Sequence, residues 1–118
     1  MLKPIGAAAV VIVLGTTLAF ASDPVGRYRV TGSNPGGGNE YSGTVTVERT
    51  GETFRVSWQI GSQVFTGTGI GSDKGLAVSY RSSDFHGLAI YGVDGDGWDG
   101  VWTVTDGRTL GTEKWRRE

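Results

Sequence analysis

The sequence lacks cysteine and has only one histidine and three prolines among its 118 residues. Without cysteine the chain has no disulfide and no thiolate for metal binding or nucleophilic chemistry. An excess of one charge is also lacking, because 11 Lys and Arg residues stand against 12 Asp and Glu residues. A nucleic-acid-binding protein usually carries a strongly basic field. We therefore expect no nucleic-acid partner.

Long apolar runs are missing except at the N-terminus. Residues 1–21 contain a basic residue, an apolar run from Ile5 to Phe20 and a final Ala-Phe-Ala. These parts are typical of a secretory signal peptide. A membrane anchor is the alternative, but the uninterrupted apolar stretch is shorter than the ~20 residues that a spanning helix needs. We predict cleavage before Ser22 and export to the periplasm or the medium, which leaves residues 22–118 as a single domain.

Glycine is abundant, with 21 residues. It disfavours long helices, because each interior glycine costs about 1 kcal/mol relative to alanine. From Gly26 onward, apolar and polar residues alternate with period two, as they do in antiparallel strands that bury one face. Turn-forming clusters divide this stretch into eight predicted strands, at residues 26–32, 40–50, 53–61, 63–71, 75–81, 87–93, 98–105 and 108–116.

Short connections between these strands indicate that successive strands are spatial neighbours. Glycines placed two residues after an aromatic residue leave space for a neighbouring ring and let a strand bend. The predicted fold is therefore an all-β, antiparallel up-and-down meander that closes into a small barrel of about eight strands, since closure removes exposed edges. The longest connection, residues 33–39, is interpreted either as a binding loop at the barrel mouth or as a plain mobile connection. Its three consecutive glycines favour the second interpretation.

Patterns for catalysis and metal binding are weak. His86 lies in a predicted turn, and the chain contains no Gly-x-Ser-x-Gly elbow, which argues against a serine hydrolase. The aspartates of the Asp-rich segment, residues 94–100, adjoin glycines as they do in tight turns. A calcium loop needs an oxygen ligand at its fifth position, where Trp98 stands. We predict no enzymatic activity, no metal site and no cofactor.

One candidate binding site is on the surface. If the first and last predicted strands pair, five basic side chains form what is termed here the basic stripe, comprising Arg27, Arg29, Lys114, Arg116 and Arg117. Such a stripe suits an acidic protein surface or an anionic polymer. The alternative is that these charges only keep the closing seam soluble. We predict that the stripe lies opposite the Asp-rich segment.

The other candidate site is an interior pocket lined by Trp58, Trp98 and Trp102. An eight-stranded barrel is either filled by side chains or just wide enough for one small ligand. Because the predicted strands are short, large rings are expected to fill the interior as a packed core. The outward residues are polar, which predicts that the barrel does not insert into a membrane.

The stretch from Gly26 to Arg116 resembles small exported bacterial proteins that sometimes carry a fibronectin-binding label. The resemblance rests on the strings Tyr41-Ser-Gly-Thr-Val-Thr-Val, Thr53-Phe-Arg-Val-Ser-Trp, Phe65-Thr-Gly-Thr-Gly-Ile, Leu76-Ala-Val-Ser-Tyr and Gly97-Trp-Asp-Gly-Val-Trp-Thr. It implies a non-catalytic binding protein with an extracellular-matrix or cell-envelope partner. A structural envelope protein without a specific ligand is an alternative.

The chain also resembles, more distantly, the calycin barrels, which include lipocalins and avidins. Calycins carry Gly-x-Trp on the first strand and a late arginine that packs across the ring. In this sequence Gly26 matches the glycine, Tyr28 replaces the tryptophan and Arg116 is the positional analogue of the arginine. This resemblance implies a small-molecule carrier.

Overall fold

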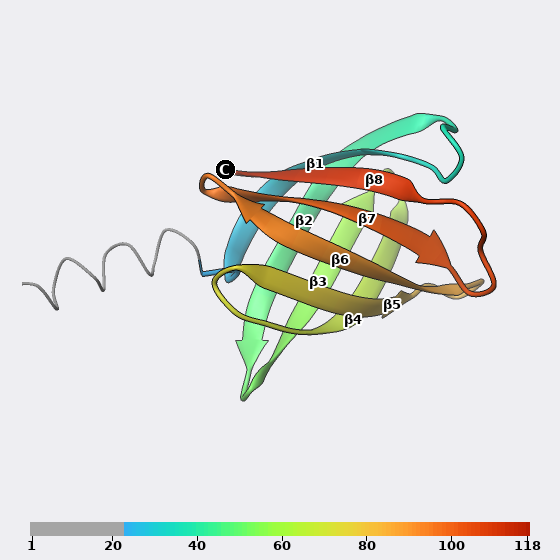
Figure 1. The fold of residues 1–118 in the computed structure, drawn as a ribbon. Helices are drawn as coiled ribbons and strands as arrows, with labels where there is room; N and C mark the ends of the chain where they lie inside the picture. The colour runs from blue at the N-terminus through green and yellow to red at the C-terminus, as the bar shows by residue number, and fades with distance from the viewer. Residues whose placement is uncertain (1–22) are drawn as a thin grey trace, which may run out of the picture.

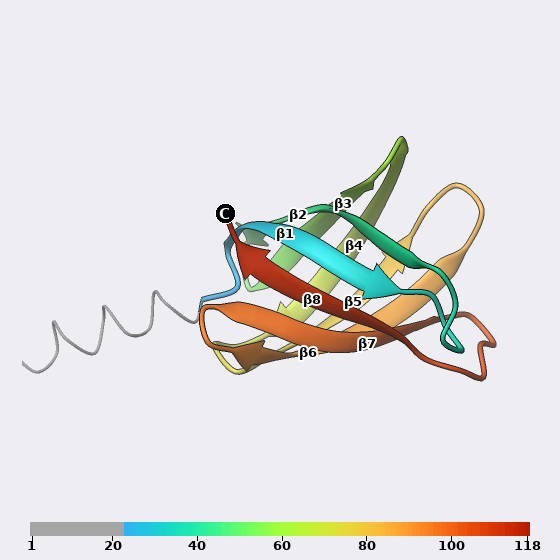
Figure 2. The ribbon, with the colours of Figure 1, turned by 90° about the horizontal axis from the view of Figure 1, so that it is seen from above.

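Alternating apolar and polar side chains form eight strands in the computed structural model, which describes residues 23–118. The strands are β1 (Gly26–Ser33), β2 (Glu40–Thr50), β3 (Thr53–Ile60), β4 (Gln63–Gly71), β5 (Gly75–Arg81), β6 (His86–Asp94), β7 (Gly97–Val104) and β8 (Gly111–Arg117). Each strand pairs antiparallel with the next, and β1 pairs with β8, so the sheet closes on itself (Figures 1 and 2). The predicted all-β meander barrel is confirmed. The predicted signal peptide lies outside the described residues, among which no helix is long and apolar enough to cross a membrane.

The predicted strand ends agree with the observed ones to within one residue, except at the start of β8. Residues 108–110 form part of a loop instead of a strand. Within this loop Gly107 N donates to Val104 O at 2.8 Å, and Thr103 Oγ1 donates to Thr109 O at 3.0 Å. Asp106 adopts a positive φ of 65°, a left-handed conformation that aspartate tolerates better than most residues.

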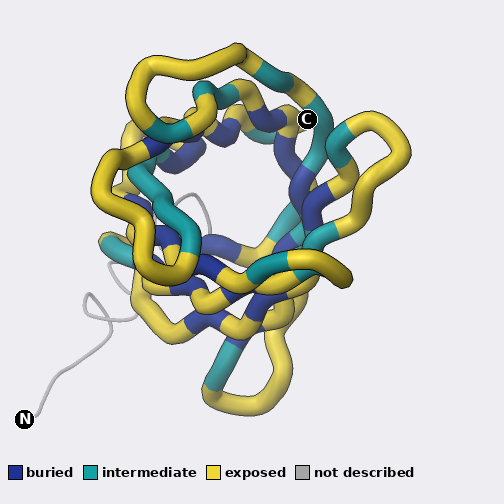
Figure 3. Tube along the Cα trace, turned by 90° about the vertical axis from the view of Figure 1, so that its right-hand side faces the viewer, coloured by how far each residue is buried: buried dark blue, intermediate teal, exposed yellow. Residues whose placement is uncertain are grey.

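The up-and-down order gives the barrel two different ends. The mouth is the end formed by loops 34–39, 61–62, 82–85 and 105–110. The closed end carries the other three connections, together with residues 23–25 and the C-terminus. Figure 3 looks along the barrel from the mouth and shows buried residues alternating with exposed ones around the ring. This alternation places the core inside the barrel.

Aromatic packing fills the closed end. Trp98 and Trp115 are fully buried there, and Tyr28 donates its hydroxyl hydrogen to Pro24 O at 2.7 Å. The Arg117 guanidinium carbon lies 4.8 Å from the centre of the Tyr28 ring, within cation–π range. The same guanidinium donates to the carbonyls of Val25 and two aspartates, Asp23 and Asp96. Residues 23–25, which precede β1, therefore cover this end of the barrel.

Candidate functional site

The mouth half of the barrel contains a cavity of about 340 Å³. This volume lies near the lower end of the ~300–1,000 Å³ typical of small-molecule pockets. Asn34, Ile60, Gln63 and Glu113 contribute to its lining. The other lining side chains are all aromatic: Tyr41, Trp58, Phe65, Tyr80, Phe85, Tyr91 and Trp102. The cavity thus has broad apolar walls and few polar groups.

A packed core occupies only the closed half of the barrel, so the expectation that large rings fill the whole interior does not hold at the mouth. Trp58 and Trp102 line the cavity, as the pocket hypothesis predicted, but Trp98 does not. Trp98 lies four residues before Trp102 on β7, which at ~3.3 Å per residue places it about 13 Å away along the strand, toward the closed end. There it pairs with Trp115 in the closed half.

Glu113 is the polar centre of the cavity. It points inward from β8 and is only 7% exposed. Its Oε1 accepts hydrogen bonds from Tyr91 Oη at 2.8 Å, Trp115 Nε1 at 2.9 Å and Trp58 Nε1 at 3.2 Å. Its Oε2 accepts one from Tyr41 Oη at 2.7 Å. Four donors from four strands therefore converge on one carboxylate.

The negative charge of Glu113 contributes to raised pKa values of the three tyrosines around it. Burial, the negative charge of Glu113 and hydrogen bonds to it raise the pKa values of Tyr41 and Tyr91 well above the ordinary value. Burial and the same charge raise the pKa of Tyr80 to about 12. The three phenols therefore keep their protons at neutral pH, and those of Tyr41 and Tyr91 act as donors toward the carboxylate.

Glycines on neighbouring strands make room for the rings around the cavity. Four aromatic residues stand directly opposite glycines in the sheet register: Tyr41–Gly32, Tyr80–Gly87, Tyr91–Gly100 and Trp102–Gly111. A Cβ added at Gly100 would collide with the Tyr91 ring, and one at Gly32 with the Tyr41 hydroxyl. The expectation that glycines leave space for neighbouring rings is confirmed at Gly100.

The glycine-rich loop, residues 34–39, lies at the mouth, and its Asn34 lines the cavity. Asn34 N donates to Asn39 O at 2.9 Å and Gly38 N to Asn34 O at 3.1 Å. Gly36 N donates to Leu110 O at 3.2 Å, which joins this loop to the loop before β8. The loop thus lies beside the cavity, and its interpretation as a binding loop stays a prediction.

Sequence reasoning missed Glu113 as a site residue. The signal that could have found it is the alternation of β8, in which Glu113 is in phase with the inward Gly111 and Trp115. A carboxylate on the inward face of a barrel strand is rare unless it is hydrogen-bonded or takes part in binding or catalysis.

The indole nitrogens of Trp98 and Trp102 are also buried, and neither has a hydrogen-bond partner among the described residues.

The first and last strands pair as predicted, with Arg29 opposite Arg116. Arg27, Arg29, Lys114 and Arg116 are exposed on the outer face. Arg117 is not part of this surface, because its guanidinium covers Tyr28 and binds carbonyls at the closed end. It is therefore Arg117, rather than Arg116, that packs across the first-strand ring.

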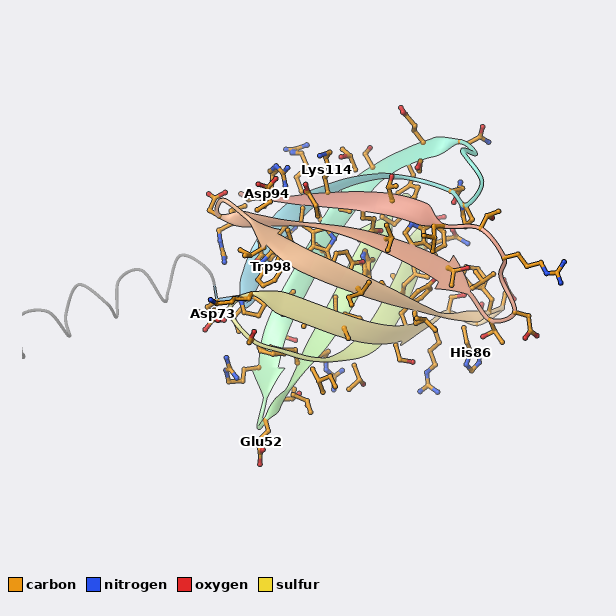
Figure 4. The ribbon with its side chains drawn as sticks, viewed as in Figure 1. Glu52, Asp73, His86, Asp94, Trp98 and Lys114 are labelled. Carbon is orange, nitrogen blue, oxygen red and sulfur yellow. The ribbon has the colours of Figure 1, made fainter. Side chains whose placement is uncertain are left out.

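The prediction that the basic stripe lies opposite the Asp-rich segment is wrong. Strand β7 pairs with β8, and β6 is the next strand in the sheet, so the aspartates lie close to the stripe. Asp94 and Lys114 appear on the same side of the barrel (Figure 4). Asp99 accepts from Arg116 at 3.0 Å and from Lys114 at 3.4 Å, and Asp94 accepts from Arg116 at 3.2 Å. Although desolvation opposes the effect, the hydrogen bond and charge of Arg116 lower the pKa of Asp99. At the C-terminus, Glu118 pairs with Arg27 at 3.0 Å.

The remaining titratable residues singled out in the sequence are dispersed. His86 is exposed at the start of β6, near the mouth (Figure 4). Within residues 23–118 no group of three or more histidine, aspartate or glutamate side chains is arranged to hold a metal ion.

No model of a known protein family matches the chain, and no curated protein matches it. Among solved structures, a redesigned beta barrel matches 85% of this chain and 96% of its own, with a TM-score of 0.73 and 16% sequence identity. The chain folds as a closed antiparallel β-barrel. At this identity the likeness shows the fold alone, so the resemblances to proteins with a fibronectin-binding label and to calycins stay predictions.

Proposed function

We propose that this protein is a non-catalytic binding protein that holds a small organic molecule in the mouth half of its barrel. The observation that carries the proposal is the aromatic cavity with a buried carboxylate at its centre. Ligand pockets typically combine broad apolar walls with a few precisely placed polar groups. The arrangement favours the small-molecule carrier over a structural envelope protein without a ligand.

The cellular setting of this proposal comes from the sequence. The basic start, apolar centre and Ala-Phe-Ala end of residues 1–21 support export to the periplasm or the medium. We therefore propose an exported carrier or sensor that acts outside the cytoplasm, without membrane insertion.

A macromolecular partner at the basic stripe is the second candidate function. It is supported by the pairing of β1 with β8, which gathers Arg27, Arg29, Lys114 and Arg116 on one outer face. An acidic protein of the matrix or envelope, or an anionic polymer, suits this face. We rank it below the cavity, because three carboxylates, those of Asp94, Asp99 and Glu118, pair with three of the four cations.

Isothermal titration calorimetry with three small aromatic probes tests the proposed function. The probes are benzyl alcohol, benzylammonium and phenylacetate, which differ in charge but are similar in size. We expect saturable one-to-one binding of at least one probe. Failure of all three to bind would contradict the proposed function.

A pair of neighbouring variants locates the binding. Gln63→Phe places a ring at the cavity lining, whereas Val64→Phe places the same ring on the outer face, where Val64 is 56% exposed. Gln63→Phe should weaken probe binding at least tenfold, and Val64→Phe should bind as the wild type does. Equal affinity in both variants would place the probe outside the cavity.

A further inference from the structure

We propose that the cavity selects a small organic cation, with an N–H group directed at Glu113 and an apolar body between the aromatic walls. This inference rests on the proposed function and names the chemical class of its ligand. Primary and secondary ammonium groups and guanidinium groups have the required N–H donor.

The hydrogen bonds of Glu113 leave one oxygen with unused capacity. An ionised carboxylate offers about four acceptor sites, two on each oxygen. Oε1 already receives three donors from residues 23–118, but Oε2 receives only the Tyr41 hydroxyl. Since Glu113 itself lines the cavity, Oε2 is the atom that can accept a further hydrogen bond from a ligand.

The charge of Glu113 has no cationic partner within the described part of the chain. Its four donors are phenols and indoles, which carry no formal charge. No Lys, Arg or His nitrogen of residues 23–118 forms an ion pair with it, although five such pairs occur elsewhere among these residues. Buried charges are normally paired with an opposite charge. A ligand cation would complete the pair.

The cavity walls also favour a cation. Tyr41, Trp102, Tyr80 and Trp58 form a continuous chain of aromatic contacts, with ring centres 6.2, 6.2 and 5.8 Å apart in that order. Aromatic faces attract cations within about 6 Å of the ring centre, and tryptophan does so most strongly. An anionic ligand would meet the negative faces of the same rings and the negative charge of Glu113. The aromatic walls and the carboxylate therefore both favour a cation over an anion.

The probe series described above separates this inference from the proposed function. Benzylammonium and benzyl alcohol have the same number of heavy atoms and differ in charge. Wild-type protein should bind benzylammonium at least tenfold more tightly than benzyl alcohol, and phenylacetate most weakly. Binding of the first two with equal affinity would overturn the cation inference and leave the proposed function standing, whereas failure of all three probes would contradict both.

Variants assign the selectivity to Glu113. Glu113→Gln should reduce the preference for benzylammonium to less than threefold while benzyl alcohol still binds. Glu118→Gln, which removes the same charge from an exposed position, should keep the wild-type preference. An unchanged preference in a folded Glu113→Gln protein would overturn the inference.

Tyr41→Phe keeps the test decisive where Glu113→Gln does not fold. This variant retains the carboxylate and removes the one donor that Oε2 now receives. The preference for benzylammonium over benzyl alcohol should then equal or exceed that of the wild type. A preference reduced below that of the wild type would contradict the role assigned to Oε2.

Discussion

Replacing Glu113 by leucine should destabilise the barrel by about 0.5–3 kcal/mol, although leucine is the more usual residue for a core. The change removes the common acceptor of four donors, those of Tyr41, Tyr91, Trp58 and Trp115. The two tyrosine hydroxyls line the cavity and can rotate toward water. The two indole N–H groups are fixed by their rings and stay directed at the vanished carboxylate.

The magnitude follows from those two indoles. Each buried donor left without a partner costs ~1–3 kcal/mol, which gives ~2–6 kcal/mol for Trp58 and Trp115 together. Burial of the leucine side chain returns ~1.5–3 kcal/mol. The expected net loss is therefore about 0.5–3 kcal/mol. Glu113→Gln should lower the free energy of unfolding by less than Glu113→Leu does, because the amide oxygen of glutamine can still accept the hydrogen bonds that Oε1 now receives.

Urea unfolding followed by tryptophan fluorescence measures these changes, provided that the transition is two-state. Glu118→Leu is the matched control, and it should change the free energy of unfolding by no more than ~1 kcal/mol because its carboxylate forms only an exposed ion pair. A Glu113→Leu protein as stable as the wild type would contradict a net stabilising role for the Glu113 hydrogen bonds. It would mean that desolvation of the carboxylate cancels its four hydrogen bonds.

Four further predictions concern the glycine spaces, the tyrosines, the outer surface and the N-terminus. Gly100→Val should lower the free energy of unfolding by ~1–3 kcal/mol or more, because the added side chain clashes with the Tyr91 ring. Gly92→Val is the control, and it should have a much smaller effect in the same urea assay because a Cβ added there meets no atom within 4 Å. The cavity tyrosines keep their protons above pH 10 in the folded protein and lose them near pH 10 in the unfolded chain. The free energy of unfolding should therefore fall as the pH rises above about 10, by up to ~1.4 kcal/mol per pH unit for each tyrosine. A urea midpoint that stays constant up to pH 11 (~1 unit above the ordinary pKa) would contradict the raised tyrosine pKa values. Replacing Arg27, Arg29 and Arg116 by Gln should cost no more than ~0–1 kcal/mol each, and it should abolish any salt-sensitive binding of an acidic partner if the stripe is a recognition surface. Mass spectrometry of the exported protein should find Ser22 at its N-terminus, and an intact Met1 would disprove cleavage.

The fold could be predicted almost completely from the sequence because one physical signal repeats along the chain. Period-two alternation fixes which side chains face inward, and turn-forming clusters mark where strands end. The start of β8 was missed because the turn-forming pair Asp106-Gly107 predicted a strand start directly after it, whereas hydrogen bonds from Thr103 and Gly107 hold residues 108–110 as a loop. Those hydrogen bonds depend on contacts that no local pattern encodes.

The candidate site was only partly predictable. Trp58 and Trp102 were expected in a pocket, since inward aromatic rings are visible in the alternation. Whether rings fill a barrel or leave a cavity depends on how far along the axis each one sits, and the separation of Trp98 from Trp102 decides this in the structure. Glu113 was missed because its inward phase with Trp115 was not weighed as a sign of a buried carboxylate. The four donors that make its burial possible come from strands distant in sequence, so no local pattern shows them.

Indole N–H signals in proton–nitrogen correlation NMR report on the proposed binding of a cation beside Glu113 in the mouth half of the barrel. Three of the four indoles report on this region: Trp58 and Trp115 bond to Glu113, and Trp102 lines the cavity. Trp98, buried in the closed half, is an internal control. On titration with benzylammonium, the signals of Trp58, Trp102 and Trp115 should move along one saturable curve while that of Trp98 stays fixed. Unchanged signals from all four indoles, or a shift confined to Trp98, would contradict the proposed binding.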